Sequence, residues 1–206
     1  FDRLEDPTHR AKSLTNLALV YRRSGRLDDA LAANDRALAI QREYGYLETL
    51  PDSLLNQAEL QYARGELARA TDSYEAAIDA AMENGRDERA AKARTNLSQV
   101  LTERGRLGLG FRRCQEAIDT FDRLGATDGL ALAYTSRALI NRCAGKFERA
   151  REDAERALSL ARTLDNDDRI AAADFGLLLV GATGLVLLDL LAVPAVVRPV
   201  FGGSIL

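Results

Sequence analysis

Residues 22–38 read RRSGRLDDALAANDRAL, and this phrase returns three more times at a fixed interval of 40 residues. The later copies are YARGELARATDSYEAAI at 62–78, TERGRLGLGFRRCQEAI at 102–118 and RCAGKFERAREDAERAL at 142–158. One glycine marks the same point in every copy: Gly25, Gly65, Gly105 and Gly145. A fixed period of this length predicts a stack of repeated units, and such proteins act through extended surfaces.

The composition is that of a soluble globular protein. The chain has 206 residues, of which 47% are apolar and 29% charged, and its net charge is -3. Because the charge is small, we expect no direct binding of nucleic acid. Cys114 and Cys143 lie in helical patterns without metal-ligand spacing, which favours a reducing, cytoplasmic location. The first ten residues carry no signal-peptide pattern; the chain starts at Phe1, and we interpret it as part of a longer protein.

Helix signals divide each copy into a helical hairpin. Asp6-Pro7 is a helix-start signal, apolar residues then recur at helical spacing up to Ser24, and Gly25 ends the helix. A second helix follows as far as Tyr44, and the short turn between the helices predicts an antiparallel pair. A second glycine column separates the hairpins. No strand pattern occurs in this region, so we predict an all-α fold with repeats at about 8–45, 51–85, 87–125 and 128–164.

The repeated residues resemble the tetratricopeptide repeat (TPR) family over roughly residues 8–164. The first copy carries the resemblance through Leu14, Leu17, Ala18, Tyr21, Gly25, Leu27, Ala30 and Ala37, and the second and fourth copies match. The third departs at Arg94 and Gly110. The long period is similar to that of kinesin light chains and of sensor modules in bacterial regulators. The resemblance implies a right-handed α-solenoid over residues 1–164, with four repeats and an irregular fifth unit after them.

Small residues occupy two further columns, where they should let helix backbones approach closely. The first helices carry Ala18, Ala58, Ser98 and Ala138, and the second helices carry Ala30, Ala70, Gly110 and Ala150. In the third repeat Gly108 and Gly110 should each weaken the helix by about 1 kcal/mol relative to alanine.

The segment 165–206 differs from the repeats because it is strongly apolar. From residue 170 onward its only charges are Asp174, Asp189 and Arg198. Three interpretations remain open: a degenerate hairpin that caps the fourth repeat, a membrane span over about 175–197, and a poorly packing end whose apolar face belongs against an absent partner. A second copy of the chain is one such partner.

No residue set in the sequence predicts catalysis, a metal site or a cofactor. His9 is the only histidine and lies near the N-terminus, where we expect it to be solvated. The glycine-rich GRLGLG at 105–110 follows a helix and lacks the patterns of phosphate-binding loops. We therefore predict a protein that is not an enzyme.

A polar column predicts the binding surface. Asn16, Asn56, Asn96 and Ser136 again step by 40 residues along the first helices. The resemblance places these helices on a concave face, where a carboxamide can both donate to and accept from a peptide bond. We predict that this face binds an extended segment of a protein or peptide, with contributions from Lys12, Lys92, Arg23 and Gln99. The two lysines suit acidic ligand groups, whereas Asp52 and Glu59 should disfavour a uniformly acidic ligand.

Overall fold

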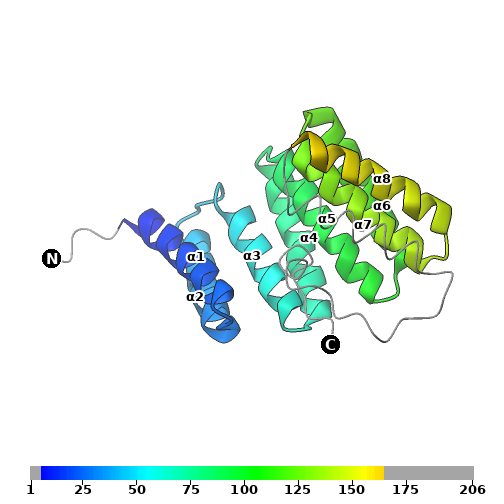
Figure 1. Cartoon of the computed structure of the whole chain (residues 1–206). Helices are drawn as coiled ribbons and strands as arrows, with labels where there is room; N and C mark the ends of the chain where they lie inside the picture. The colour runs from blue at the N-terminus through cyan, green and yellow to red at the C-terminus, as the bar shows by residue number, and fades with distance from the viewer. Residues whose placement is uncertain (1–5, 165–206) are drawn as a thin grey trace. The chain divides into compact units, whose positions relative to one another are not determined.

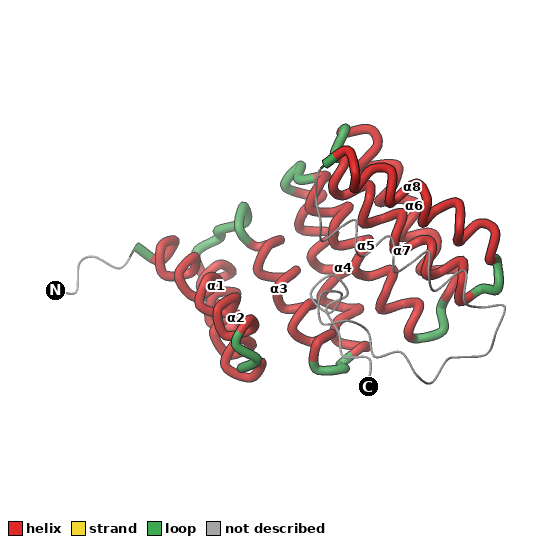
Figure 2. The backbone as a smooth tube through the Cα atoms, viewed as in Figure 1, coloured by secondary structure: helices red, strands yellow, loops and turns green. Residues whose placement is uncertain are grey.

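The computed structural model describes residues 6–164, which form eight α-helices joined by short turns (Figure 1). The helices are α1 (Pro7–Arg23), α2 (Leu27–Glu43), α3 (Leu50–Ala63), α4 (Leu67–Glu83), α5 (Asp87–Glu103), α6 (Leu107–Leu124), α7 (Thr127–Cys143) and α8 (Phe147–Thr163). No strand occurs between residues 6 and 164 (Figure 2). The prediction of an all-α fold is confirmed.

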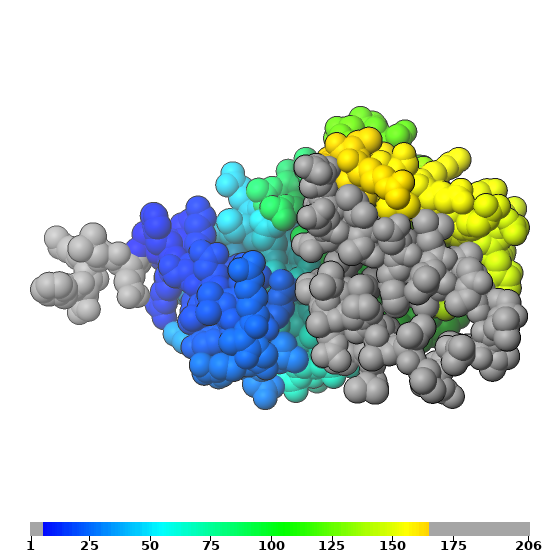
Figure 3. Space-filling view, viewed as in Figure 1, coloured from blue at the N-terminus to red at the C-terminus, as the bar shows by residue number. Residues whose placement is uncertain are grey.

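The chain divides into two compact units, with the boundary inside α5 between Ala93 and Arg94. In unit 1, α1 packs against α2, α3 packs against α4, and α2 also contacts α3. In unit 2, α7 packs against both α6 and α8. Each unit is therefore built from neighbouring hairpins, as in TPR-like proteins. The atoms of α1 and α2, blue in the space-filling view, form one continuous body (Figure 3).

The glycine columns mark the turns, as the sequence predicts. Gly25 has a φ of 75°, a left-handed backbone conformation that side chains with a Cβ rarely adopt. This conformation lets the Arg26 N–H donate to the Tyr21 carbonyl at 2.9 Å, which satisfies a carbonyl left open at the helix end. The other glycines with positive φ are Gly45, Gly65, Gly85, Gly105, Gly125 and Gly145.

Both columns of small residues are buried. Gly110 on α6 is the most demanding position, because a Cβ there would lie 2.9 Å from the Ser98 carbonyl oxygen and 3.1 Å from the Thr102 hydroxyl. The expectation that alanine would be better at Gly110 is therefore wrong, since the space for a methyl group is missing. A Cβ at Gly108 would meet no atom within 4 Å, so the propensity argument still applies there.

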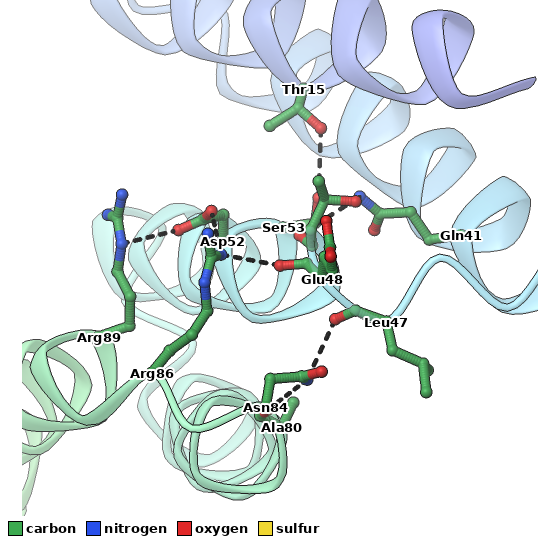
Figure 4. Close-up of polar contacts among 11 residues, drawn as sticks. Thr15, Gln41, Leu47, Glu48, Asp52, Ser53, Ala80, Asn84, Arg86 and Arg89 are labelled. Carbon is green, nitrogen blue, oxygen red and sulfur yellow. Dashed lines mark hydrogen bonds and ion pairs between the residues drawn. The ribbon is translucent and has the colours of Figure 1, made fainter.

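The second hairpin starts later than the others, because residues 47–49 form turns rather than a first helical turn. The carbonyl groups of Leu47 and Glu48 accept hydrogen bonds from the next turn between hairpins. Asn84 Nδ2 donates to the Leu47 carbonyl at 3.1 Å, and Arg86 donates to the Glu48 carbonyl at 2.7 Å (Figure 4). These hydrogen bonds connect the α2–α3 loop of unit 1 to the turn between the end of α4 and the start of α5.

The interpretations of the segment 165–206 concern residues outside the described part of the chain. Within residues 6–164, the longest apolar stretches fall short of what a helix needs to span a bilayer.

Candidate peptide-binding face

Three predicted binding residues lie on one side of α1. Lys12, Asn16 and Arg23 follow one another at intervals of four and seven residues, which places them on the same helix face. All three side chains are exposed. On α3, Asp52, Asn56 and Glu59 share a face in the same way and are half-buried.

Two contacts connect α1 with α3 beside these faces. The hydroxyl groups of Thr15 and Ser53 lie 3.2 Å apart. The guanidinium of Arg22, six residues after Asn16, donates to the carboxylate of Glu59, three residues after Asn56. The two predicted asparagines therefore lie in the interval between a hydroxyl pair and an ion pair, on adjacent first helices.

The start of α5 joins the same surface through Asp52. Arg86 Nη1 lies 3.2 Å from Asp52 Oδ2, and Arg89 Nε lies 3.3 Å from Asp52 Oδ1 (Figure 4). Lys92 follows Arg89 by one helical turn and is exposed. We call this surface the α1–α3–α5 face, and it consists of Lys12, Asn16, Leu19, Arg23, Asp52, Asn56, Glu59, Arg89 and Lys92.

The α1–α3–α5 face carries both positive and negative side chains. Both of its carboxylates, Asp52 and Glu59, are paired with arginines. Lys12, Arg23 and Lys92 are exposed, and none of them pairs with a carboxylate of residues 6–164. The residues of the face carry four positive and two negative charges, so the face is positive on balance, and the expectation that Asp52 and Glu59 disfavour a uniformly acidic ligand stays a prediction.

The predicted residues beyond Lys92 lie in unit 2 and have a different environment. Gln99 and Ser136 are buried, and Gln99 Nε2 donates to Ser136 Oγ at 3.1 Å. Asn96 is half-buried and also has an interaction partner. Gln99 and Ser136 thus connect α5 and α7, whereas Asn16 is exposed and Asn56 is half-buried.

A buried polar network in unit 2 was missed by the sequence reasoning. Arg137 makes a two-point contact with Asp153, from Nη2 to Oδ1 at 2.6 Å and from Nε to Oδ2 at 3.0 Å. Asn141 Nδ2 donates to the same Oδ2 at 2.9 Å, and Arg137 also donates to Gln115. Charged residues in a helical pattern are usually solvated, so the sequence gives little indication that this network is buried. The one indication is that Arg137 stands at a position where two other repeats carry leucine.

Cys114 lies beside this network and is a buried structural thiol. Its Sγ donates to the Ala133 carbonyl at 3.1 Å. Burial raises the pKa of Cys114 to about 12, although the charge of Arg137 opposes part of that shift. The thiol therefore remains protonated and unreactive at neutral pH.

The histidine and the acidic residues add no second site. His9 is exposed, as expected, and its Nδ1 lies 2.8 Å from the Asp6 carboxylate. Among residues 6–164, no group of three or more His, Cys, Asp or Glu side chains is arranged to hold a metal ion.

The sequence of residues 6–83 matches the model of the tetratricopeptide repeat family. The matched residues make up less than half of the 206-residue chain. The matched stretch covers the first two hairpins, which carry Asn16 and Asn56. No curated protein matches the sequence.

Solved structures extend the likeness in fold to the later hairpins. A Rap protein complexed with competence and sporulation factor is 18% identical, with a TM-score of 0.80, and the match covers 89% of this chain and 51% of that one. The Rap conjugation gene regulator of the plasmid pLS20, in complex with the Phr* peptide, is 19% identical, with a TM-score of 0.72 and coverage of 84% and 47%.

A third similar structure also consists of TPR-like repeats over most of the matched length. It is a putative kinesin light chain from Podosopora anserina with nearly identical TPR-like repeats, 16% identical, with a TM-score of 0.70 and coverage of 88% and 90%. At these identities the likeness concerns the fold. The present chain spans about half the length of the Rap proteins.

Proposed function

We propose that this chain is a non-catalytic interaction module that binds an extended, acidic segment of a protein or peptide on its α1–α3–α5 face. The observation that carries the proposal is the pairing pattern on that face. Its carboxylates are paired with arginines, while Asn16 and three cationic side chains are exposed and Asn56 is half-buried.

The two kinds of accessible group have different parts in the proposed binding. Asn16 and Asn56 supply donors and acceptors that match a peptide backbone of any sequence. Lys12, Arg23 and Lys92 supply positive charge along the same surface, which favours acidic side chains and speeds their association. Backbone recognition therefore gives general affinity, and charge gives selectivity.

The similar proteins support this kind of role. The Rap regulator of pLS20 was solved with a bound peptide, and another Rap protein with competence and sporulation factor. A binding role within a larger bacterial regulatory protein, acting in the cytoplasm, is consistent with these relatives. The positive face explains which class of segment this chain would select.

The direct experiment measures peptide binding by fluorescence anisotropy. The probes are labelled decapeptides with Glu or Asp at alternating positions and matched decapeptides with Gln or Asn in their place. We expect the acidic set to bind more tightly, and we expect this preference to shrink as salt is added. Asn16→Ala and Asn56→Ala should each weaken binding about fivefold, since a hydrogen bond contributes ~1 kcal/mol.

Two matched substitutions serve as controls. Ser13→Ala changes an exposed side chain on another side of α1, and Lys146→Ala removes an exposed lysine outside the face. Both should leave the affinity unchanged, whereas Lys12→Ala should weaken it for the acidic set alone. Equal affinity for both peptide sets, or equal effects of Lys12→Ala and Lys146→Ala, would refute the proposal.

A further inference from the structure

Two buried side-chain amides lie where α2 packs against the second hairpin. Asn34 is fully buried, and its Nδ2 donates to the Ser53 carbonyl at 3.0 Å. Gln41 is 1% exposed, and its Nε2 donates to the hydroxyl of Thr49, the N-cap of α3, at 2.9 Å (Figure 4). The two amides lie seven residues apart and therefore share one side of α2. The α2–α3 junction of unit 1 is thus built in part from amides that are sealed from water.

Each amide has one polar atom without a partner. Asn34 Oδ1 and Gln41 Oε1 are buried and accept no hydrogen bond from residues 6–164. A buried carbonyl oxygen that lacks a donor costs free energy, whereas the same oxygen in contact with water is satisfied. This cost falls only on the closed junction, so it favours separation of α2 from α3.

The other repeats have residues of different chemistry at these two positions. The position of Asn34 is taken by Tyr74, Cys114 and Ala154, and that of Gln41 by Ala81, Phe121 and Ala161. All six side chains are at most 2% exposed. The buried amides are therefore a property of α2, and the repeat itself does not require them.

Unit 2 contains an apolar form of the Gln41 contact. Phe121 and Gly129 lie 80 residues after Gln41 and Thr49, at the same two positions of the repeat. A Cβ at Gly129 would lie 2.3 Å from the Phe121 ring, so the ring packs directly against the start of α7. An aromatic ring packed on glycine thus replaces the amide and its unpartnered oxygen, and we expect the α6–α7 junction to be the more stable of the two.

The contacts between the first two hairpins on the α1–α3–α5 face are polar as well. The ion pair of Arg22 and Glu59 has side chains that are 33% and 20% exposed, so water can replace it at small cost. The hydroxyl pair between α1 and α3 is partly buried. Separation of the α1–α2 hairpin would break both contacts and move Asn16 away from Asn56.

We propose that the α1–α2 hairpin opens and closes against α3 and α4, and that a segment bound to the α1–α3–α5 face holds it closed. The second part rests on the proposed function, because the bound segment must reach Asn16 on α1 and Asn56 on α3 at the same time. A ligand that binds only the closed form lowers the open population by mass action. The buried amides of α2 therefore leave the hairpin free to open until the ligand orders it.

The first test is hydrogen exchange of the full chain without ligand. We expect the backbone N–H groups of α1 and α2 to exchange through a shared opening, faster than those of α3 and α4. Gln41→Met removes the buried amide at nearly constant volume and should reduce the opening equilibrium constant at least about tenfold. Arg36→Met is the matched control, because it places the same side chain at an exposed position of α2. Equal effects of the two substitutions, or α1 and α2 exchanging no faster than α3 and α4, would overturn the proposal.

The second test repeats the exchange measurement with the acidic decapeptides. At a free concentration of about one hundred times the Kd, exchange of α1 and α2 should slow about a hundredfold. A peptide that binds in the anisotropy assay without slowing this exchange would overturn the inference and leave the proposed function in place. Absence of binding would refute the proposed function and the ligand-dependent closure together, while the first test still decides whether the buried amides let the hairpin open.

Discussion

The buried pair of Arg137 and Asp153 offers a prediction whose sign can be worked out. The Asp153 side chain is 6% exposed and that of Arg137 is 13% exposed. The guanidinium also lies 5.0 Å from the ring centre of Tyr134 and 6.0 Å from that of Phe111. Burial lowers the pKa of Arg137, but the hydrogen bonds and charge of Asp153 raise it above its ordinary value, so the guanidinium stays charged.

Asp153→Asn removes one charge and leaves the shape of the side chain. The Arg137 guanidinium then remains buried without its counter-charge, and it cannot relieve the cost by losing a proton. Breaking a buried pair in this way costs about 3–5 kcal/mol, and we expect the lower end because the amide oxygen still accepts one hydrogen bond. Arg137→Leu combined with Asp153→Asn removes both charges, while the amide oxygen can still accept from Asn141.

The double variant should therefore be more stable than Asp153→Asn alone. Leu17 and Leu97 occupy the position of Arg137 in the first and third repeats, so the repeat geometry accommodates leucine. The assay is urea unfolding followed by circular dichroism at the helix band, with m-values compared to confirm that the same surface unfolds. A single variant within about 0.5 kcal/mol of the unchanged chain, or a double variant less stable than the single one, would refute the reasoning.

Three further predictions use other parts of the structure. Gly110→Ala should destabilise unit 2 by about 1–3 kcal/mol because the added methyl group meets the Ser98 carbonyl oxygen, whereas Gly108→Ala should stabilise unit 2 by up to ~1 kcal/mol. Thermal unfolding of the two variants compares these effects, and equal changes in melting temperature would contradict the described packing at Gly110. A maleimide should label Cys143, which is exposed, and spare Cys114 until the chain unfolds; rapid labelling of both in the native state would show that Cys114 is accessible. Hydrogen bonds from the Thr8 N–H and, as the second cause, from the His9 side chain lower the pKa of Asp6. The stabilisation of α1 by the Asp6 carboxylate should therefore be complete above the unfolded-state pKa and be lost as the pH falls through the lower folded-state pKa. Amide hydrogen exchange of α1 as a function of pH measures this, and Asp6→Asn should remove the pH dependence.

The fold could be predicted because the features that decide it repeat along the sequence. Glycines at a fixed interval set the turns, and alanines at a fixed interval set the close contacts between helices. Both signals depend on residue type and spacing alone. Gly110 shows where this reasoning fails, since the distance between α6 and the Ser98 carbonyl is a property of packing and overrides helix propensity.

The candidate site could be predicted only in part. The spacing correctly placed Asn16 and Lys12 on one side of α1, because helix geometry fixes such relations. The pairing of Glu59 with Arg22, and of Asp52 with the start of α5, joins residues 34–37 positions apart and depends on side-chain conformations that spacing does not encode. For the same reason, the burial of Gln99 could not be foreseen.

The most direct test of the binding account is a side-chain amide NMR titration with the acidic decapeptides. The account predicts that the carboxamide signals of Asn16 and Asn56 shift on binding and that the signal of Gln99, which is buried, stays in place. Shifts concentrated at Gln99 or Gln115, with Asn16 and Asn56 unmoved at saturating peptide, would contradict it.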